Sequence, residues 1–190
     1  MDITQLLGGD LGKQVIAGIS QKTQTTEQET SSVIQTATPV LLGMLKKNAE
    51  TKTGASNLLG ALNEHDGSIL NNLGNFFGQE NTSDGQGILD HILGGKKKTV
   101  EQSISTQTGI DASKVTHILA LLAPIIMGKL GSQAQSSSGG IGDLLGNLMS
   151  GMDSSSAGGN ILSSVLGQAT GKGSSKKGGL GSSLGGFFKS

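Results

Sequence analysis

The chain contains no cysteine, arginine, tryptophan or tyrosine. Without cysteine it has no disulfide bonds, no thiol nucleophile and no cysteine-ligated metal. Without arginine it lacks the side chain that most often reads guanine in DNA, and its formal net charge of zero gives no attraction to nucleic acid. Because aromatic residues make up only 2% of the chain, a core must be built from Leu, Ile, Val, Ala and Met, which favours helices over sheets.

Long apolar runs are also scarce. The longest is Ile118–Met127, ten residues that include Pro124, whereas a membrane span needs about 20. The first residues, Met1–Gln5, show neither the basic start nor the apolar run of a signal peptide. We therefore expect a soluble protein located in the cytoplasm.

An internal repeat is the most informative feature of the sequence. Gly12–Ala49 aligns without a gap with Lys97–Ala134, at an offset of 85 residues. Identical pairs in this alignment include Val15/Val100, Ile19/Ile104, Ser20/Ser105, Thr23/Thr108, Pro39/Pro124, Gly43/Gly128, Leu45/Leu130 and Ala49/Ala134. Two copies are too few for a solenoid. We predict two pseudo-repeated helical units, 1–85 and 86–170, followed by a tail, 171–190.

Each unit has the pattern of a short helix followed by a long one. We predict short helices over 13–23 and 99–108 and long helices over 26–48 and 111–131, because apolar residues recur there at helical spacing. Thr26 with Glu29 forms a capping-box pattern, and Asp111 is a suitable N-cap. Val33 and Ile118 are expected in the core. Pro39 and Pro124 each either kink a long helix or begin a new one.

Shorter amphipathic pieces lie between and after these helices. Ile69–Gly74, Ile88–Gly94 and Ile161–Gly167 read as brief helices ended by a glycine that adopts the left-handed C-cap, and Asn81–Gly85 reads as a loop. The tail is rich in Gly, Ser and Lys and too poor in apolar residues to offset the entropy of ordering, so we expect disorder there. Its Phe187 and Phe188 are candidates for docking on another surface.

No catalytic, cofactor-binding or metal-binding residue is predicted, and no cofactor is expected. The histidines are His65, His91 and His117, and none has a partner at the spacing of a metal site. Lys96–Lys98 and the tail lysines are candidates for weak phosphate or membrane binding, but we interpret them as solvated. No serine lies in a nucleophile motif.

The proline motifs, Pro39-Val-Leu-Leu-Gly43 and Pro124-Ile-Ile-Met-Gly128, resemble those of the bacterial domain-of-unknown-function family numbered 937. The chain is also similar, more distantly, to YidB-like helical proteins. The resemblance covers residues 3–134 and extends more faintly to 170. It implies a multihelical, all-α fold and supplies no catalytic or ligand residues.

Three classes of function follow from these observations. The first is a non-catalytic interaction or scaffolding protein that binds an unknown protein partner or itself, with no sequence-specific binding to nucleic acid. The second is a membrane-surface or envelope-associated protein, for which the tail lysines and Phe187–Phe188 give only marginal binding. The third is an enzyme, which would need a constellation of residues that the sequence does not show. We favour the first.

Overall fold

All the secondary structure in the described part of the chain is helical, as predicted. The computed structural model describes residues 9–79, 82–136, 140–150 and 155–167. The elements are α2 (Gly9–Thr23), α3 (Glu27–Ala49), α4 (Lys52–Glu64), α5 (Ser68–Asn71), α6 (Leu73–Gly78), α7 (Ser83–Leu93), the 3-10 turn η1 (Gly94–Lys96), α8 (Lys97–Thr108), α9 (Ala112–Ser136), α10 (Ile141–Ser150) and α11 (Ala157–Gly167). The predicted tail, 171–190, lies outside the described residues.

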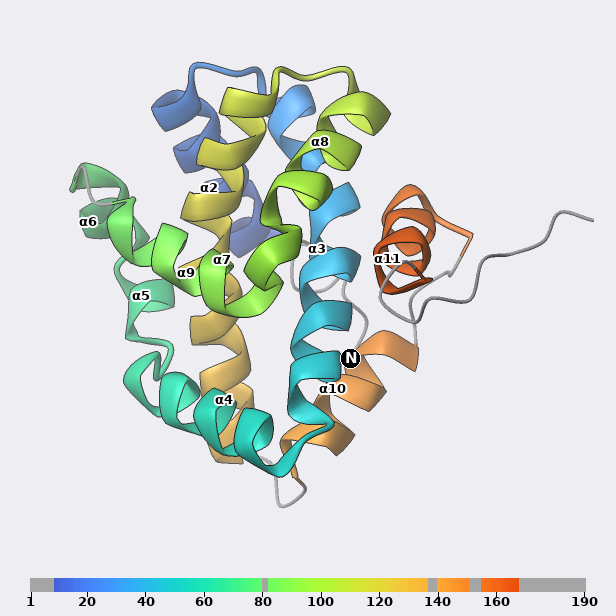
Figure 1. The fold of residues 1–190 in the computed structure, drawn as a ribbon. Coiled ribbons are helices and arrows are strands. Elements are labelled where there is room, and N and C mark those ends of the chain that lie inside the picture. Colours follow the sequence, from blue (N-terminus) through green and yellow to red (C-terminus); the bar gives the residue numbers. More distant parts are fainter. Residues whose placement is uncertain (1–8, 80–81, 137–139, 151–154, 168–190) are drawn as a thin grey trace, which may run out of the picture.

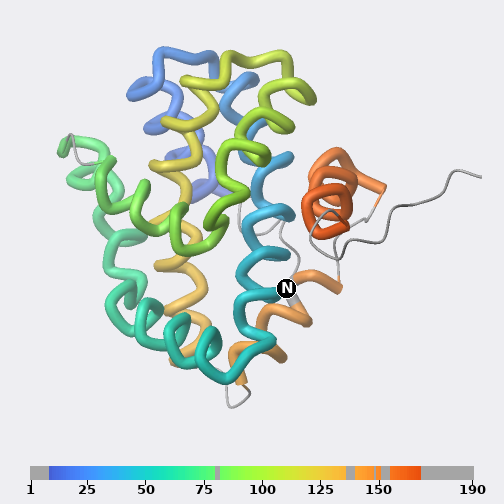
Figure 2. Tube along the Cα trace, in the orientation of Figure 1, coloured from blue at the N-terminus to red at the C-terminus, as the bar shows by residue number. Residues whose placement is uncertain are grey.

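The two longest helices, α3 and α9, are in contact and carry the other helices around them (Figures 1 and 2). Helix α3 contacts α2, α4, α7, α8, α10 and α11, and helix α9 contacts α2, α4, α5, α7, α8 and α10. Val33 of α3 and Ile118 of α9 are both completely buried, as the apolar spacing predicts. The molecule is therefore organised around the two helices that contain the proline motifs.

The starts of both long helices are fixed by side-chain caps. The Thr26 hydroxyl accepts from the Glu29 N–H at 3.1 Å, and the Glu29 carboxylate accepts from the Thr26 N–H at 2.8 Å, which completes the capping box. At the start of α9, Asp111 Oδ1 accepts from the Ser113 N–H at 2.8 Å. Both predicted caps are confirmed, because each satisfies backbone donors that the first helical turn leaves unpaired.

Pro39 and Pro124 lie inside their helices, so neither begins a new one. A proline has no N–H for the carbonyl four residues earlier. For Pro124 that carbonyl belongs to Ala120, and Gly85 of α7 packs directly against it. A Cβ added at Gly85 would lie 2.6 Å from the carbonyl carbon of Ala120, closer than real Cβ atoms come. A glycine thus lets α7 cover the backbone group that the proline leaves without its helical partner.

Two local predictions are wrong. Residues 83–85 were expected in a loop but form the first turn of α7, where Asp84 lies favourably at the helix N-terminus. The second concerns Gly74, which was expected to end a helix but lies within α6, whereas α11 does end at Gly167, the last residue described in that part of the chain. Gly94, which follows α7, has a positive φ of 54° but its ψ of −137° is not that of a left-handed C-cap.

One hydrophobic cluster runs through the described residues from Val15 to Val165. It combines side chains from both predicted units, and the boundary predicted after residue 85 falls inside α7. The division into two repeated units stays a prediction. The two halves, however, share a single core, since α2 also contacts α9 and α8 also contacts α3.

Candidate functional site

The three histidines are not gathered into a site. His65 is half-buried at the C-terminus of α4, where its backbone N–H donates to the carbonyl of Ala61. His91 and His117 are exposed. Among the residues that the structure describes, no three His, Asp or Glu side chains are grouped so that they could hold a metal ion. The histidines therefore give no starting point for a metal centre.

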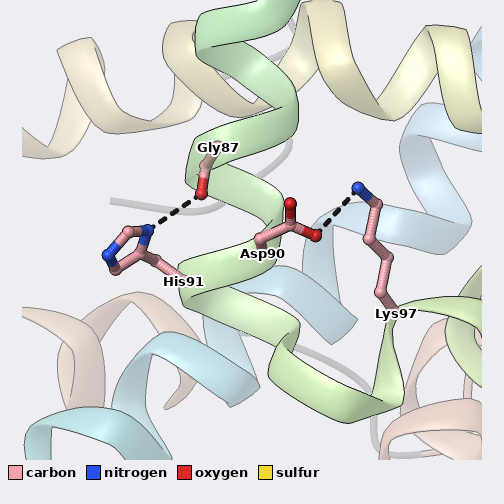
Figure 3. Close-up of polar contacts among 4 residues, drawn as sticks. All are labelled: Gly87, Asp90, His91 and Lys97. Carbon is pink, nitrogen blue, oxygen red and sulfur yellow. Dashed lines mark hydrogen bonds and ion pairs between the residues drawn. The ribbon is translucent and has the colours of Figure 1, made fainter.

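His91 lies beside an ion pair that connects α7 with α8 (Figure 3). Its Nδ1 donates to the carbonyl of Gly87 at 3.0 Å, which uses the ring in a contact within its own helix. Asp90 Oδ1 and Lys97 Nζ are 2.9 Å apart, with 63% of the Asp90 side chain and 20% of the Lys97 side chain exposed. A pair this accessible to solvent contributes at most about 1 kcal/mol. Its role is to hold α8 against α7.

Lys96 makes a longer-range contact that the sequence does not reveal. Its Nζ donates to the carbonyl of Val165, in the last turn of α11. Carbonyls in the last turn lack helical partners, and a positive charge is favourable at that end of a helix. All three neighbouring lysines, Lys96–Lys98, were interpreted as solvated from the sequence. Only Lys98 is fully exposed, and Lys96 and Lys97 are half-buried. Lys96 instead caps α11.

Three carboxylates, Glu29, Asp66 and Asp111, have a lowered pKa. In each case the main cause is a hydrogen bond to the ionised carboxylate: from the backbone of Thr26 to Glu29, from the backbone of Ser68 to Asp66, and from the side chain of Ser113 to Asp111. These carboxylates stay ionised and occupy helix or turn starts. They cap backbone donors and are poor general acids, which need a raised pKa.

A shallow groove of about 500 Å³ lies between α8 and α11. One wall is the face of α8 from Thr99 to Gln107, and the other is formed by Asn160, Ile161 and Ser164. The lining offers hydroxyl and amide groups and one apolar side chain, and no charged group. Such a surface can form hydrogen bonds but has no acid, base or anion-binding residue.

The face of α3 beneath α11 packs closely against that helix. A Cβ at Gly158 of α11 would lie 2.9 Å from Cγ of Pro39 and still closer to the carbonyl oxygen of Thr36. A Cβ at Gly43 of α3 would lie 2.6 Å from Cδ1 of Leu162. Each helix therefore has a glycine at the point where the other comes nearest. We call the face of α3 around Thr36, Pro39 and Gly43 the helix seat.

The comparison with protein families matches residues 5–133 to the family described as bacterial protein of unknown function (DUF937). The chain belongs to this family. The DUF937 match contains helices α2 to α8 and nearly all of α9, and it confirms the resemblance inferred from the proline motifs. Helices α10 and α11 follow the matched region, so the occupant of the helix seat lies outside it. Neither the curated proteins nor the solved structures contained a match.

Helix α9 of this DUF937 chain is long and apolar enough to cross a membrane, since an 18-residue window within Ala112–Gln135 has a mean hydropathy of 1.5. However, 78% of the apolar window is buried inside the structure. The core helix of a soluble protein has the same properties. Its apolar character is accounted for by the contacts that it makes with the surrounding helices.

The residues that shape the helix seat were not identified from the sequence. Gly43 was identified as a repeated position paired with Gly128 and as the last residue of a proline motif, and Gly158 was not singled out at all. The Gly43/Gly128 pairing was nevertheless a usable signal. Gly128, like Gly43, is covered by a branched apolar side chain. A Cβ added at Gly128 would lie 2.7 Å from Cγ2 of Ile69.

Proposed function

We propose that this DUF937 chain is a non-catalytic interaction protein of scaffolding type, which binds a protein partner or further copies of itself. The helix seat is the observation that carries the proposal. It is a glycine-containing apolar surface of α3 that receives an amphipathic helix, α11, at close range. Surfaces of this kind bind helices by packing their apolar faces into a groove.

We further propose that the protein arose by duplication of one helical unit. Helices α2 and α3 have the same order as α8 and α9, and each long helix contains an internal proline followed by a glycine four residues later. Gly43 and Gly128 are each covered by an apolar side chain, Leu162 and Ile69 respectively. Duplication would explain why two equivalent faces occur in one core.

Other classes of function receive less support. We expect no catalysis, since the carboxylates with shifted pKa are helix and turn caps and the α8–α11 groove has no charged lining. We also expect no sequence-specific binding to nucleic acid, because the chain has no arginine and no net charge.

Crosslinking in the native bacterial host tests the proposal. The full chain with an affinity tag would be crosslinked in cells and purified under denaturing conditions, beside a control strain that expresses the tag alone. We expect a defined crosslinked species that contains either a second copy of the chain or one other protein in constant proportion. Recovery of the chain alone, together with a monomeric mass in solution, would contradict the proposal.

Flotation with liposomes separates this function from the membrane-surface alternative. We expect the full chain to remain unbound to anionic vesicles at physiological salt, because scattered lysines and two phenylalanines give only marginal affinity. Binding that is lost in high salt and lost on removal of residues 171–190 would instead favour a role at the membrane surface. The same chain without vesicles, spun in parallel, controls for aggregation.

A further inference from the structure

We infer that the α8–α11 groove is the docking site of the chain's own C-terminal residues Leu184–Phe188, which we call the terminal segment. The inference goes beyond the proposed function, because it assigns an occupant to a surface that the helix seat does not include. It starts from α6, a piece of similar sequence that the structure shows packed on α2.

Helix α6 shows how a Leu-Gly-x-Phe-Phe sequence docks on a helix. Leu73 is buried, and Phe76 and Phe77 are half-buried, with their rings edge to face and their centroids 5.1 Å apart. Phe77 lies over Gly18 of α2, since a Cβ added at Gly18 would lie 2.8 Å from Cγ of the ring. A small residue of α2 thus provides the place where the aromatic side chain packs.

The terminal segment repeats the sequence of α6. Leu184-Gly-Gly-Phe-Phe188 differs from Leu73-Gly-Asn-Phe-Phe77 only at its third residue. The chain has four phenylalanines and no tryptophan or tyrosine, and all four phenylalanines belong to these two segments. The terminal segment therefore carries the one further copy of the side chains with which α6 packs on α2.

The counterpart of Gly18 in the second predicted unit is not covered in this way. Helix α8 aligns with α2 at the offset of 85 residues, which pairs Gly18 with Ser103, also a small residue. Ser103 lines the α8–α11 groove of about 500 Å³. In Figure 1, α6 beside α2 and α11 beside α8 lie at opposite sides of the assembly. Residues 86–170 contain no phenylalanine, so this unit has no ring of its own for the place that Phe77 fills on α2.

The lining of the groove suits an uncharged aromatic segment. Ile161 and the threonines of α8 offer apolar carbon for contact with a ring, while Gln102 and Asn160 offer amide groups for a peptide backbone. The described residues that line the groove are uncharged, and so is the terminal segment. A phenylalanine that packs there removes about 150–250 Å² of surface from water, which favours docking.

The connection between α11 and the terminal segment is long enough. Helix α11 ends at Gly167, and Phe187 follows twenty residues later. A glycine-rich chain of that length has a root-mean-square end-to-end distance of about 25 Å. The stretch of α11 from Asn160 to Gly167 is only about 10 Å long. Such a tether gives an effective concentration on the order of millimolar, so docking needs an intrinsic dissociation constant only below about 1 mM.

Disulfide trapping in the full chain tests the docking, because the natural sequence has no cysteine. Ser164→Cys in the groove would be combined with Lys189→Cys beside the terminal segment, and the control combines Ser163→Cys with the same tail substitution. Both serines are exposed and adjacent on α11, so a tail without a docking site would reach them equally.

We expect the pair with Ser164→Cys to form an intramolecular disulfide at least about tenfold faster than the control pair, because the bond needs the two Cα atoms within about 7 Å. Mass spectrometry and non-reducing electrophoresis measure the rate and show whether one chain or two are joined. Replacing Phe187 and Phe188 by alanine should make the two rates equal.

Fluorine NMR gives a second measurement that needs no crosslink. Full chain that contains para-fluorophenylalanine has four probes, which are assigned by replacing one phenylalanine at a time with leucine. The two signals of the terminal segment should differ from those of a free peptide of residues 180–190. Ser103→Leu, which fills the groove, should move them to the free-peptide positions and leave the two signals of α6 unchanged.

Ser163→Leu is the matched control, because it adds the same side chain at an exposed position of α11 that does not line the groove. It should leave all four signals unchanged. Circular dichroism at 222 nm and cooperative unfolding in urea establish that every variant is folded before it is compared.

Three results would overturn the inference. They are equal trapping rates in the two cysteine pairs, disulfides that join two chains, and terminal-segment signals at their free-peptide positions in the full chain. Disulfides between two chains would instead place the terminal segment on another copy. Free-peptide signals that shift only when anionic vesicles are added would place it at a membrane surface. The crosslinking test of the proposed function depends on none of these results.

Discussion

Substituting Gly85 and Gly87 by alanine gives the sharpest test of how α7 packs on α9. Both residues lie in α7, and both have an ordinary negative φ, so alanine is compatible with the backbone at each position. A Cβ at Gly87 would meet nothing within 4 Å, whereas one at Gly85 would lie 2.6 Å from the carbonyl carbon of Ala120. The two substitutions add the same methyl group to the same helix and differ only in what it meets.

The expected magnitudes follow from two opposing effects. Alanine is favoured over glycine within a helix by about 1 kcal/mol, so Gly87→Ala should raise the free energy of unfolding by about 0.5–1 kcal/mol. In Gly85→Ala the same gain is opposed by overpacking against backbone atoms. Ordinary contact begins at 3.4 Å, and the carbonyl oxygen of Ala120 lies still closer to the added methyl group than the carbonyl carbon does, so the two helices must separate by more than about 0.8 Å. A gap of at least that size loses a quarter to a half or more of the packing energy of the surrounding contacts.

We therefore expect Gly85→Ala to lower the free energy of unfolding by about 2 kcal/mol, since overpacked cores lose about 1–3 kcal/mol and the obstacle here is rigid backbone. Unfolding in urea, followed by circular dichroism at 222 nm, measures both variants against the wild type. The midpoint temperature should shift by about 2–4 °C for each kcal/mol in a chain of this size. If Gly85→Ala were as stable as Gly87→Ala, the close approach of α7 to Ala120 would be refuted.

Three further predictions concern caps, charge and core. Thr26→Ala should lower the free energy of unfolding by about 1 kcal/mol, because the capping box at the start of α3 is lost. The control Thr53→Ala, at an exposed position of α4, should change the free energy of unfolding by less than about 0.5 kcal/mol. Urea unfolding measures both variants, and equal effects would argue against the cap. Hydrogen bonding from Thr26 lowers the pKa of Glu29 below 4.5, so the stability that Glu29 contributes is present above pH 4.5 and is lost as the pH falls through the lowered pKa. Glu29→Gln should flatten this part of the acid unfolding profile, and an unchanged profile would exclude the linkage. Leu122→Ala removes a fully buried side chain of α9 and should lower the free energy of unfolding by about 2–5 kcal/mol. Leu59→Ala, at a side chain that is 44% exposed, should lower the free energy of unfolding by much less. A similar loss of stability in both variants would contradict the burial of Leu122.

Features that depend on neighbouring residues were predicted well from the sequence. The long helix predicted over 26–48 is observed as Glu27–Ala49, and its capping box is formed by the two residues that the pattern identifies. The short helix predicted over 99–108 begins two residues earlier, at Lys97. Apolar spacing and capping act within one or two turns, and such interactions can be recognised without knowledge of the fold.

Features that depend on distant segments could not be predicted in this way. The carbonyl that Lys96 contacts is 69 residues away in the chain. Gly85 was predicted to lie in the loop Asn81–Gly85, whereas in the structure it lets α7 approach the backbone of α9. Gly158 has the same type of role on α3. A glycine needed for close helix packing looks like any other glycine until the facing helix is known.

The contact of α2 and α3 with α8 and α9 has a consequence for synthesis on the ribosome. Translation proceeds at about 5–20 residues per second, so α9 is completed roughly 4–17 s after α3, which ends 87 residues earlier at Ala49. During that time α3, whose Ile34 and Leu41 are fully buried in the finished protein, lacks α8 and α9 among the helices that it contacts until these have been synthesised. The nascent chain therefore exposes an apolar helix that chaperones can bind. A chain released before residue 112 would lack α9 and therefore a large part of the single core that both halves share.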